Sequence, residues 1–123
     1  MIHHIISPTN NLILNRVLEW SLLIAYYSEY DNYIVLESEE GEYVGYLMYY
    51  DNHIYKLEVK ETHRKLGYGK QLIQKYEDIC VADGIKEITL TAMNFKLISF
   101  YEKLGFVYNG NRFDNMKKNL IRR

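Results

Sequence analysis

The chain has 123 residues, which is the usual size of one domain, and we expect a single domain spanning 1–123. Apolar residues make up 48% and charged residues 25%, a balance that excludes disordered and collagen-like proteins. The 15 Lys and Arg nearly cancel the 16 Asp and Glu, giving a net charge of −1. Broad binding to nucleic acid or to an anionic membrane is therefore not expected, and any phosphate binding must be local.

Cysteine content and hydropathy bear on the compartment. Cys80 is the only cysteine, so no internal disulfide can form, and we expect a reducing compartment, the cytoplasm. The longest aliphatic run, 22–25, is far shorter than the ~20 residues of a membrane span. The four histidines lack metal-ligand spacing, so no metal site is expected.

In the N-terminal half, hydrophobic periodicity predicts four strands and one helix. A β-favouring strand at 2–6 is followed by a helix from 11 to about 26, where apolar residues recur at helical spacing. Two apolar runs, 33–36 and 43–50, flank an acidic turn and predict a hairpin, and 54–59 continues it as a third antiparallel strand. Apolar residues of both parities in 43–50 predict a central strand covered on both faces.

In the C-terminal half the period changes to that of a helix. An apolar stripe predicts a helix over 70–84, ended by a glycine, and alternation predicts a strand over 88–92. A short helix is predicted over 95–104, and the runs 106–108 and 115–120 predict a last hairpin around an Asn-Gly turn.

The resulting order, β-α-β-β-β-α-β-α-β-β, indicates an α/β fold of the α+β type. We expect a mixed, mostly antiparallel central sheet with flanking helices. The strands 54–59 and 88–92 are joined through a helix, so they should run parallel by a right-handed crossover. That helix would begin at the carboxyl end of strand 54–59, where α/β proteins bind anions.

The segment at this junction reads Arg64-Lys65-Leu66-Gly67-Tyr68-Gly69-Lys70. Two glycines one residue apart let backbone N–H groups face a shared concavity, and a helix N-terminus adds free donors, which suits a pyrophosphate. A Walker-type loop is excluded because Gln71 stands where Ser or Thr is required. A dinucleotide fingerprint is excluded because Leu72 replaces its third glycine.

The loop 64–69 resembles the Arg/Gln-x-x-Gly-x-Gly/Ala signature of the GNAT superfamily of acyl-CoA-dependent N-acetyltransferases, at the same strand-to-helix junction. A second element of that family is an Asn followed seven residues later by a Tyr, ahead of a Gly-Phe pair. In this chain it appears as Asn94, Tyr101 and Gly105-Phe106. The resemblance covers about 43–108.

Two departures from the family pattern stand out. The family often has Gly directly after the Arg, where this chain has Lys65. The stretch 7–33 has room for one helix where the family often has two, and that region commonly shapes the acceptor site. The identity of the acceptor is thus the least transferable property.

The resemblance implies a GNAT fold and acetyl-CoA as the bound cofactor. Backbone groups of Leu57, Glu58 and Val59 would hold the pantetheine arm, and the N–H groups of 66–70 would hold the pyrophosphate. A backbone N–H near Val59 would also polarise the thioester carbonyl. The full set of cofactor-binding residues implied in this way is Leu57, Glu58, Val59, Arg64, Lys65, Leu66, Gly67, Tyr68, Gly69, Lys70, Asn94 and Tyr101.

Catalysis would need an acid and a base. Tyr101 matches the family tyrosine that can protonate the departing thiolate, although a core aromatic next to Phe100 is the alternative interpretation. An amine with a pKa near ~10.4 is neutral in only about one molecule in 2,500 at pH 7, so a group must accept its proton. Glu58 and His53 are the candidates. A cross-strand charge pair for Glu58, an exposed turn for His53 and a water chain remain alternatives.

We therefore expect an N-acetyltransferase that binds acetyl-CoA and a primary amine together and transfers the acetyl group directly. The amine could belong to a small molecule, a peptide N-terminus or a lysine, and a homodimer is compatible with the family. Two alternatives stay open. One is a nucleic-acid-binding or regulatory module that uses the basic residues near the loop. The other is a GNAT-like domain that binds coenzyme A without turnover.

Overall fold

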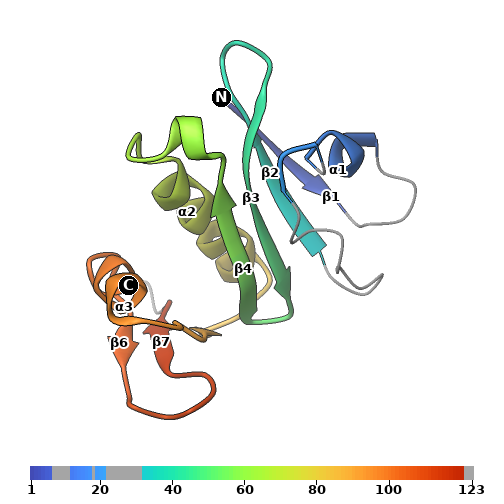
Figure 1. The fold of residues 1–123 in the computed structure, drawn as a ribbon. Coiled ribbons are helices and arrows are strands. Elements are labelled where there is room, and N and C mark those ends of the chain that lie inside the picture. The colour runs from blue at the N-terminus through green and yellow to red at the C-terminus, as the bar shows by residue number, and fades with distance from the viewer. Residues whose placement is uncertain (7–11, 18, 22–31, 121–123) are drawn as a thin grey trace.

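The computed structural model describes residues 1–6, 12–17, 19–21 and 32–120. The strands are β1 (Ile2–Ile6), β2 (Asn32–Glu37), β3 (Tyr43–Tyr50), β4 (His53–Val59), β5 (Glu87–Leu90), β6 (Val107–Tyr108) and β7 (Met116–Asn119). The helices are α1 (Leu12–Val17), α2 (Tyr68–Ala82) and α3 (Phe95–Glu102), with a short 3-10 turn at Glu61–His63 that the sequence did not suggest. Figure 1 shows these elements.

The strands form a mixed sheet in the order β1-β2-β3-β4-β5-β7-β6. From β1 to β4 each neighbouring pair is antiparallel, and β5, β7 and β6 form a second antiparallel group. The two groups meet at the parallel pair β4–β5, which confirms the predicted crossover through α2. The expected mostly antiparallel sheet with flanking helices is therefore confirmed.

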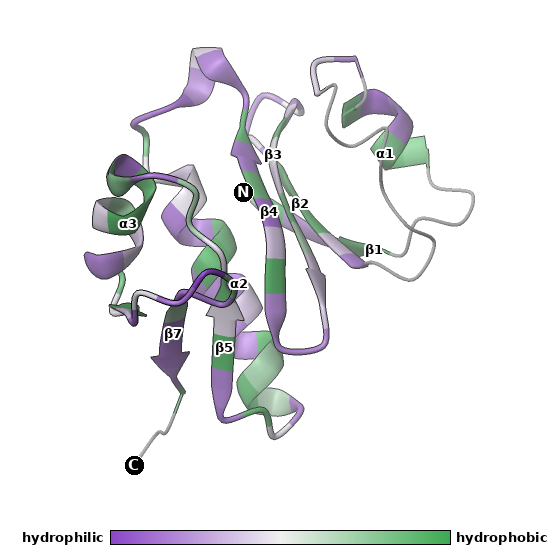
Figure 2. Ribbon diagram, turned by 60° about the horizontal axis from the view of Figure 1, so that its bottom comes forward, coloured by the Kyte–Doolittle hydropathy of each residue, from purple (hydrophilic) through white to green (hydrophobic). Residues whose placement is uncertain are grey.

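Helices cover the sheet from two sides. The larger apolar cluster joins α2 to residues such as Leu47 of β3, and the smaller one joins α1 to residues such as Tyr46. Leu47 and Tyr46 are neighbours on one strand and both are buried, so β3 is the doubly covered central strand that its apolar pattern predicted. Figure 2 shows hydrophobic residues along α2 and the central strands, and a mostly hydrophilic segment leading into α2.

Helix α2 begins at Tyr68, two residues before the predicted Lys70. The reason is Gly67, which occupies the N-cap with φ of 83° and lets the chain turn directly into the helix. The other end is as predicted. Gly84 follows the helix with φ of 78° and its N–H donates back to the last turn, which satisfies a helix-end carbonyl.

The predicted single helix over 11–26 is confirmed at 12–17 and is wrong at 19–21. Helix α1 ends at Val17, and a turn at Glu19 and Trp20 follows. The Trp20 indole N–H donates to the Tyr43 carbonyl at 3.0 Å, which ties the chain to β3 instead of extending the helix. Residues 7–11, 18 and 22–31, where the rest of that prediction falls, lie outside the described residues.

Smaller differences concern the ends of other elements. Strand β5 ends at Leu90, before the predicted end of the strand at Ala92, because the Asn115 side chain binds both the N–H and the carbonyl of Ala92, at 2.8 and 2.9 Å. Helix α3 ends at Glu102 and β7 begins after Asn115. Within the described part of the chain, no helix is long and apolar enough to cross a membrane.

Candidate functional site

Strand β4 is paired differently along its length. Its partner β5 is in register only at His53 with Thr89 and at Ile54 with Leu90. On the other side, β3 pairs with β4 as far as Val59. The second half of β4 therefore has a ladder partner on one side and a gap toward β5 on the other.

Backbone groups of β4 alternate between β3 and this gap. The Lys60 N–H donates to the Val44 carbonyl of β3 at 2.7 Å. In an antiparallel strand, the N–H and the carbonyl of one residue point to the same side, and those of the next residue point to the opposite side. The backbone groups of Glu58 therefore also face β3, while those of Leu57 and Val59 face the gap. Of the three residues predicted to hold a cofactor arm by their backbone, Leu57 and Val59 present their groups to the gap and Glu58 does not.

A β-bulge lies in the middle of β4. Ile54 pairs with Tyr49 and Lys56 with the adjacent Met48, so Tyr55 is an extra residue with no partner of its own in β3. The extra residue shifts the alternation of side chains by one position, so the side chains after the bulge point to the opposite face from the one they would otherwise occupy.

The bulge brings the two candidate bases to one face of the sheet. His53 and Glu58 are an odd number of residues apart, and in a regular strand they would lie on opposite faces. Ile54 belongs to the larger apolar cluster on the α2 side, so its neighbour His53 faces the other way. Glu58 lies opposite Tyr46, which belongs to the α1-side cluster. Both candidates therefore face the α1 side.

The loop before α2 holds two left-handed residues, Gly67 at φ of 83° and Lys65 at φ of 66°. The helix has no side-chain cap, so its first-turn N–H groups are not taken by a capping side chain. Arg64 donates from Nε to the Val59 carbonyl at 3.0 Å and fastens the loop to β4. A side chain at Gly69 would have its Cβ 3.3 Å from the ring of Phe100, so α3 sits close against this loop.

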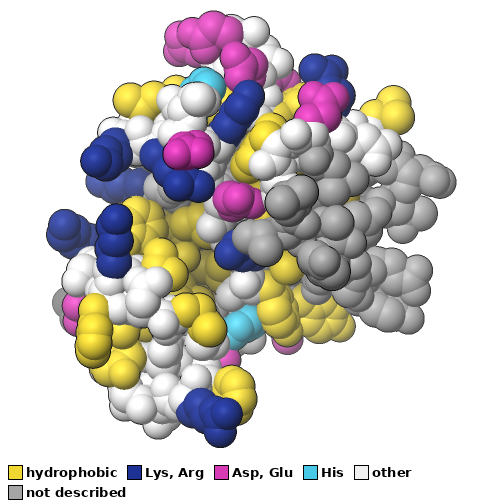
Figure 3. All heavy atoms as spheres, viewed as in Figure 1, with side chains coloured by type: hydrophobic (Ala, Val, Ile, Leu, Met, Phe, Trp, Pro, Cys, Tyr) yellow, Lys and Arg dark blue, Asp and Glu magenta, His cyan; other side chains and the backbone are white. Residues whose placement is uncertain are grey.

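Cations surround the same loop. Three of them, Lys60, Arg64 and Lys65, lie between β4 and α2, and Lys70 lies in the first turn of α2. Figure 3 shows Lys and Arg side chains gathered over the loop and the beginning of α2, with a hydrophobic surface next to them. Free N–H donors, the positive end of a helix and these cations together suit a diphosphate.

Tyr101 lies at the head of the gap. It lines a cavity of about 100 Å³ together with residues of β4, β5 and α3, and its side chain is 7% exposed. Burial raises the pKa of Tyr101 to about 12, so the phenol keeps its proton at neutral pH. Phe106 packs edge-on against its ring. Asn94 caps α3 by accepting the Leu97 N–H at 2.9 Å.

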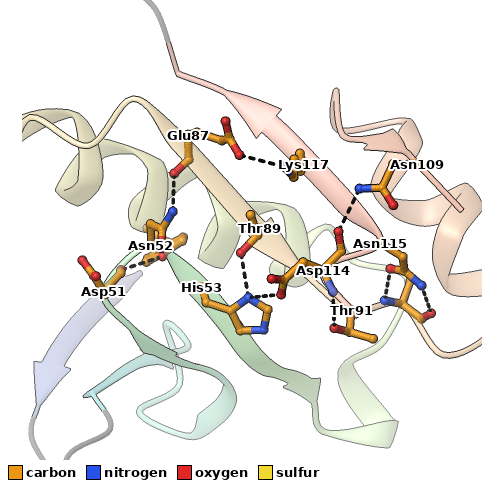
Figure 4. Close-up of polar contacts among 12 residues, drawn as sticks. Asp51, Asn52, His53, Glu87, Thr89, Thr91, Asn109, Asp114, Asn115 and Lys117 are labelled. Carbon is orange, nitrogen blue, oxygen red and sulfur yellow. Dashed lines mark hydrogen bonds and ion pairs between the residues drawn. The ribbon is translucent and has the colours of Figure 1, made fainter. Parts of the chain in front are cut away.

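His53 lines a larger cavity of about 540 Å³ next to that of Tyr101. Its Nδ1 lies 2.7 Å from the Thr89 hydroxyl and 3.2 Å from a carboxylate oxygen of Asp114 (Figure 4). Burial lowers the pKa of His53, and the negative charge of Asp114 opposes part of that change. The cavities of His53 and Tyr101 share four lining residues, which are Ile54, Tyr55, Thr91 and Met93.

Glu58 lies in separate surroundings at the other end of β4. Its Oε1 accepts hydrogen bonds from the Ser21 hydroxyl at 2.6 Å and from the Tyr46 hydroxyl at 2.8 Å. It lines a cavity of about 380 Å³ with Trp20 and Arg64, and that cavity shares no lining residue with those of His53 and Tyr101.

Sequence reasoning missed the partners of both candidate bases. Thr89 and Asp114 reach His53 from segments that follow it by 36 and 61 positions, and Ser21 reaches Glu58 from before the sheet. No local spacing signals such contacts, because the sheet and its connecting loops create them. Among the described residues, no group of three or more His, Cys, Asp or Glu could hold a metal ion, and Cys80 is buried in the core.

Several solved protein structures share this architecture. Tetrahymena GCN5 superposes with a TM-score of 0.73 at 16% identity, covering 98% of this chain and 97% of that one. An N-acetyltransferase structure from Lactobacillus plantarum gives 0.72 at 18% identity, covering 98% and 100%. The KacTA–DNA complex gives 0.63 at 16% identity, covering 97% and 94%.

These likenesses are below 25% identity and show a shared fold. A search of curated protein sequences gives no significant match. The family model of the acetyltransferase (GNAT) family matches residues 2–106, which is most of the chain and includes β4, the loop, Asn94 and Tyr101. The chain belongs to the GNAT acetyltransferase family.

Proposed function

We propose that this protein transfers the acetyl group of acetyl-CoA to a primary amine, with both substrates bound together. The observation that carries the proposal is the gap between β4 and β5, with a buried tyrosine at its head and an uncapped helix N-terminus at its mouth. An extended thioester arm that ends in a diphosphate matches this arrangement, because one end meets an acid and the other meets N–H donors and cations.

The backbone of β4 would bind the arm. Leu57 and Val59 turn their N–H and carbonyl groups to the gap, so they can pair with an amide-bearing chain much as β5 does with the first half of β4. The Arg64 guanidinium already occupies the Val59 carbonyl, which leaves Leu57 and the Val59 N–H for the arm. The diphosphate would lie against the N–H groups at the start of α2.

His53 is the better placed of the two candidate bases. Its cavity adjoins that of Tyr101, where the thioester would end, whereas Glu58 lies about 15 Å further along β4 at a rise of ~3.3 Å per residue. Burial lowers the pKa of His53, so the imidazole is neutral at pH 7 and can accept the proton of the amine. Glu58, whose Oε1 already accepts hydrogen bonds from two hydroxyl groups, is assigned to holding Ser21, in the segment after α1, and Tyr46 of β3 against β4.

Tyr101 would supply the proton to the departing thiolate. The raised pKa of about 12 makes it a protonated donor throughout the physiological range. Tyr101 lines the cavity in the β4–β5 gap and His53 lines the adjoining cavity, so the acid and the base would reach one reacting centre from two neighbouring cavities.

The test combines binding and turnover. Isothermal titration should show saturable coenzyme A binding, and release of free thiol from acetyl-CoA should depend on an added amine. We expect His53→Gln to lower kcat by about 10² or more, in line with loss of a general base, while the matched change Glu58→Gln lowers it far less. Equal losses in the two variants would contradict the choice of base. Absence of coenzyme A binding at millimolar concentration would contradict the proposed function.

Nucleic acid is a separate possibility, because one structurally similar protein was solved as a DNA complex. We assign the cations around the loop to the diphosphate and not to DNA, since the whole chain carries a net charge of −1. Fluorescence anisotropy with labelled duplex DNA should show no salt-sensitive binding. DNA binding that coenzyme A does not displace would contradict this assignment.

A further inference from the structure

Asp114 is held in an unusual backbone conformation directly beside His53. Its φ of 48° is left-handed, which a residue other than glycine adopts at a cost of about 1 kcal/mol or more. Two hydrogen bonds stabilise it there. Its N–H donates to the Thr91 hydroxyl at 3.2 Å, and its carbonyl accepts from the Asn109 side chain at 2.9 Å. The loop between β6 and β7 thereby presents the carboxylate to His53 (Figure 4).

The contact decides where the imidazole carries its proton. A carboxylate oxygen can only accept, and it lies 3.2 Å from Nδ1. The Thr89 hydroxyl, at 2.7 Å from the same nitrogen, could act as donor or acceptor and decides nothing alone. An unprotonated Nδ1 would place its lone pair against the carboxylate, so the proton belongs on Nδ1 and the lone pair on Nε2.

We infer that Asp114 is a positioning residue that fixes the neutral His53 with its proton on Nδ1 and its lone pair on Nε2, facing the cavity of about 540 Å³. The catalytic use of this lone pair rests on the proposed function. Figure 4 shows the second ring nitrogen of His53 turned away from Thr89 and Asp114. Tyr55 packs edge-on against the ring at 4.7 Å between centroids and restricts its rotation.

The cavity that His53 lines is open to solvent, and exposed apolar side chains form part of its lining. Met93 and Phe113 line it and are 81% and 71% exposed, and Tyr55 is 54% exposed. An amine entering past these residues would meet the lone pair of Nε2, and Nδ1 would stay beside the Asp114 carboxylate, 3.2 Å away, as the imidazole becomes charged. A carboxylate in this position stabilises the charged ring without itself taking the proton.

The tautomer can be measured directly in the protein without substrates. Nitrogen-15 NMR of the imidazole at a pH where His53 is neutral should show a protonated Nδ1 and an unprotonated Nε2. Asp114→Gly is the informative deletion because glycine accepts the left-handed backbone. In that variant we expect the population with the proton on Nε2 to rise. Asp114→Asn keeps the shape and removes the charge, and it should also lose the single tautomer. Glu40→Gln, in an exposed turn, is the matched loss of one charge and should change nothing.

A wild-type spectrum with the proton on Nε2, or an unchanged tautomer in Asp114→Gly, would overturn the inference. The effect of the same variants on catalysis is measured separately. Both Asp114 variants should lower kcat by about 10- to 100-fold, the usual effect of removing a residue that orients a functional imidazole, and leave the Kd for coenzyme A unchanged. A fixed tautomer in an inactive wild-type protein would contradict the proposed function and leave the role of Asp114 toward His53 intact.

Discussion

The two ends of β4 differ in how they are held. At His53 the strand is paired on both sides, and the side chain is fixed by Thr89 and Asp114. At Val59 it is paired only with β3, and its outward carbonyl is bound by Arg64. The paired end, at His53, holds side chains in fixed orientations. The open end, at Val59, leaves backbone hydrogen-bonding groups without a strand partner. Under the proposed function, proton transfer would take place in rigid surroundings and the cofactor would bind at an unfilled sheet edge.

This difference predicts two separable classes of variant. Changes at the paired end should lower turnover and leave coenzyme A affinity alone, because they alter side-chain chemistry. Changes at the open end should weaken coenzyme A binding through the backbone, because no side chain there is needed to bind the arm.

The largest effect is expected at the head of the gap. Tyr101→Phe removes the buried hydroxyl and should lower kcat by about 10², with little change in the Kd for coenzyme A. Tyr76→Phe is the matched control, since Tyr76 is also buried but donates to the Asp51 carbonyl in the turn between β3 and β4. It should cost about 1 kcal/mol of unfolding free energy and leave kcat unchanged. Full activity in Tyr101→Phe across the pH range would refute the acid role.

The pH dependence of kcat/KM should report the protonation of His53, at the paired end. His53 must be neutral to accept a proton, and burial lowers its pKa below 6.5 although the facing Asp114 raises it. Above that pKa, log(kcat/KM) should be nearly flat up to the pKa of the amine, because neutral His53 takes the proton of the ammonium form within the complex. Below it the slope should be one, a loss of about ten-fold per pH unit, because His53 itself becomes protonated. The break should disappear in His53→Gln. A break above pH 7 would indicate a different base.

At the open end, Gly67→Ala should act through the backbone. Alanine at φ of 83° is strained, while its Cβ would meet nothing within 4 Å. Relaxation of the loop would misdirect the N–H groups, and we expect coenzyme A to bind about ten-fold more weakly, equal to about 1.4 kcal/mol. Gly41→Ala is a matched control with the same φ and the same open space, in the β2–β3 turn. It should lower stability similarly and leave the Kd unchanged, and equal weakening in both variants would count against the loop.

The smallest effect is expected at Lys65. Its φ of 66° is strained for lysine, and glycine, which the family often carries there, adopts it freely. Lys65→Gly removes this strain but adds freedom to the unfolded chain, so the net gain in unfolding free energy should be below about 1 kcal/mol. Urea unfolding would measure it. A lower midpoint would show that the added freedom of the unfolded chain and the lost lysine side chain together outweigh the relieved backbone strain.

The sequence by itself determined most of the local structure. Period-two alternation gave β3, the apolar stripe gave α2, and Gly84 marked its end, because these signals depend only on neighbouring residues. The two glycines of the loop and the Asn94–Tyr101 spacing also led to the family, which the match over 2–106 confirms. The exception lies at 19–21, where the contact of Trp20 with β3 overrides helical periodicity.

Only the tertiary structure decided where the two candidate bases lie relative to Tyr101. The bulge at Tyr55 turns His53 and Glu58 to one face, and the divergence of β5 after Leu90 places just one of them beside Tyr101. Asp114 reaches His53 through a loop fixed by hydrogen bonds to Thr91 and Asn109. Strand register and loop closure join residues far apart in the chain, and no local spacing in the sequence encodes their distance.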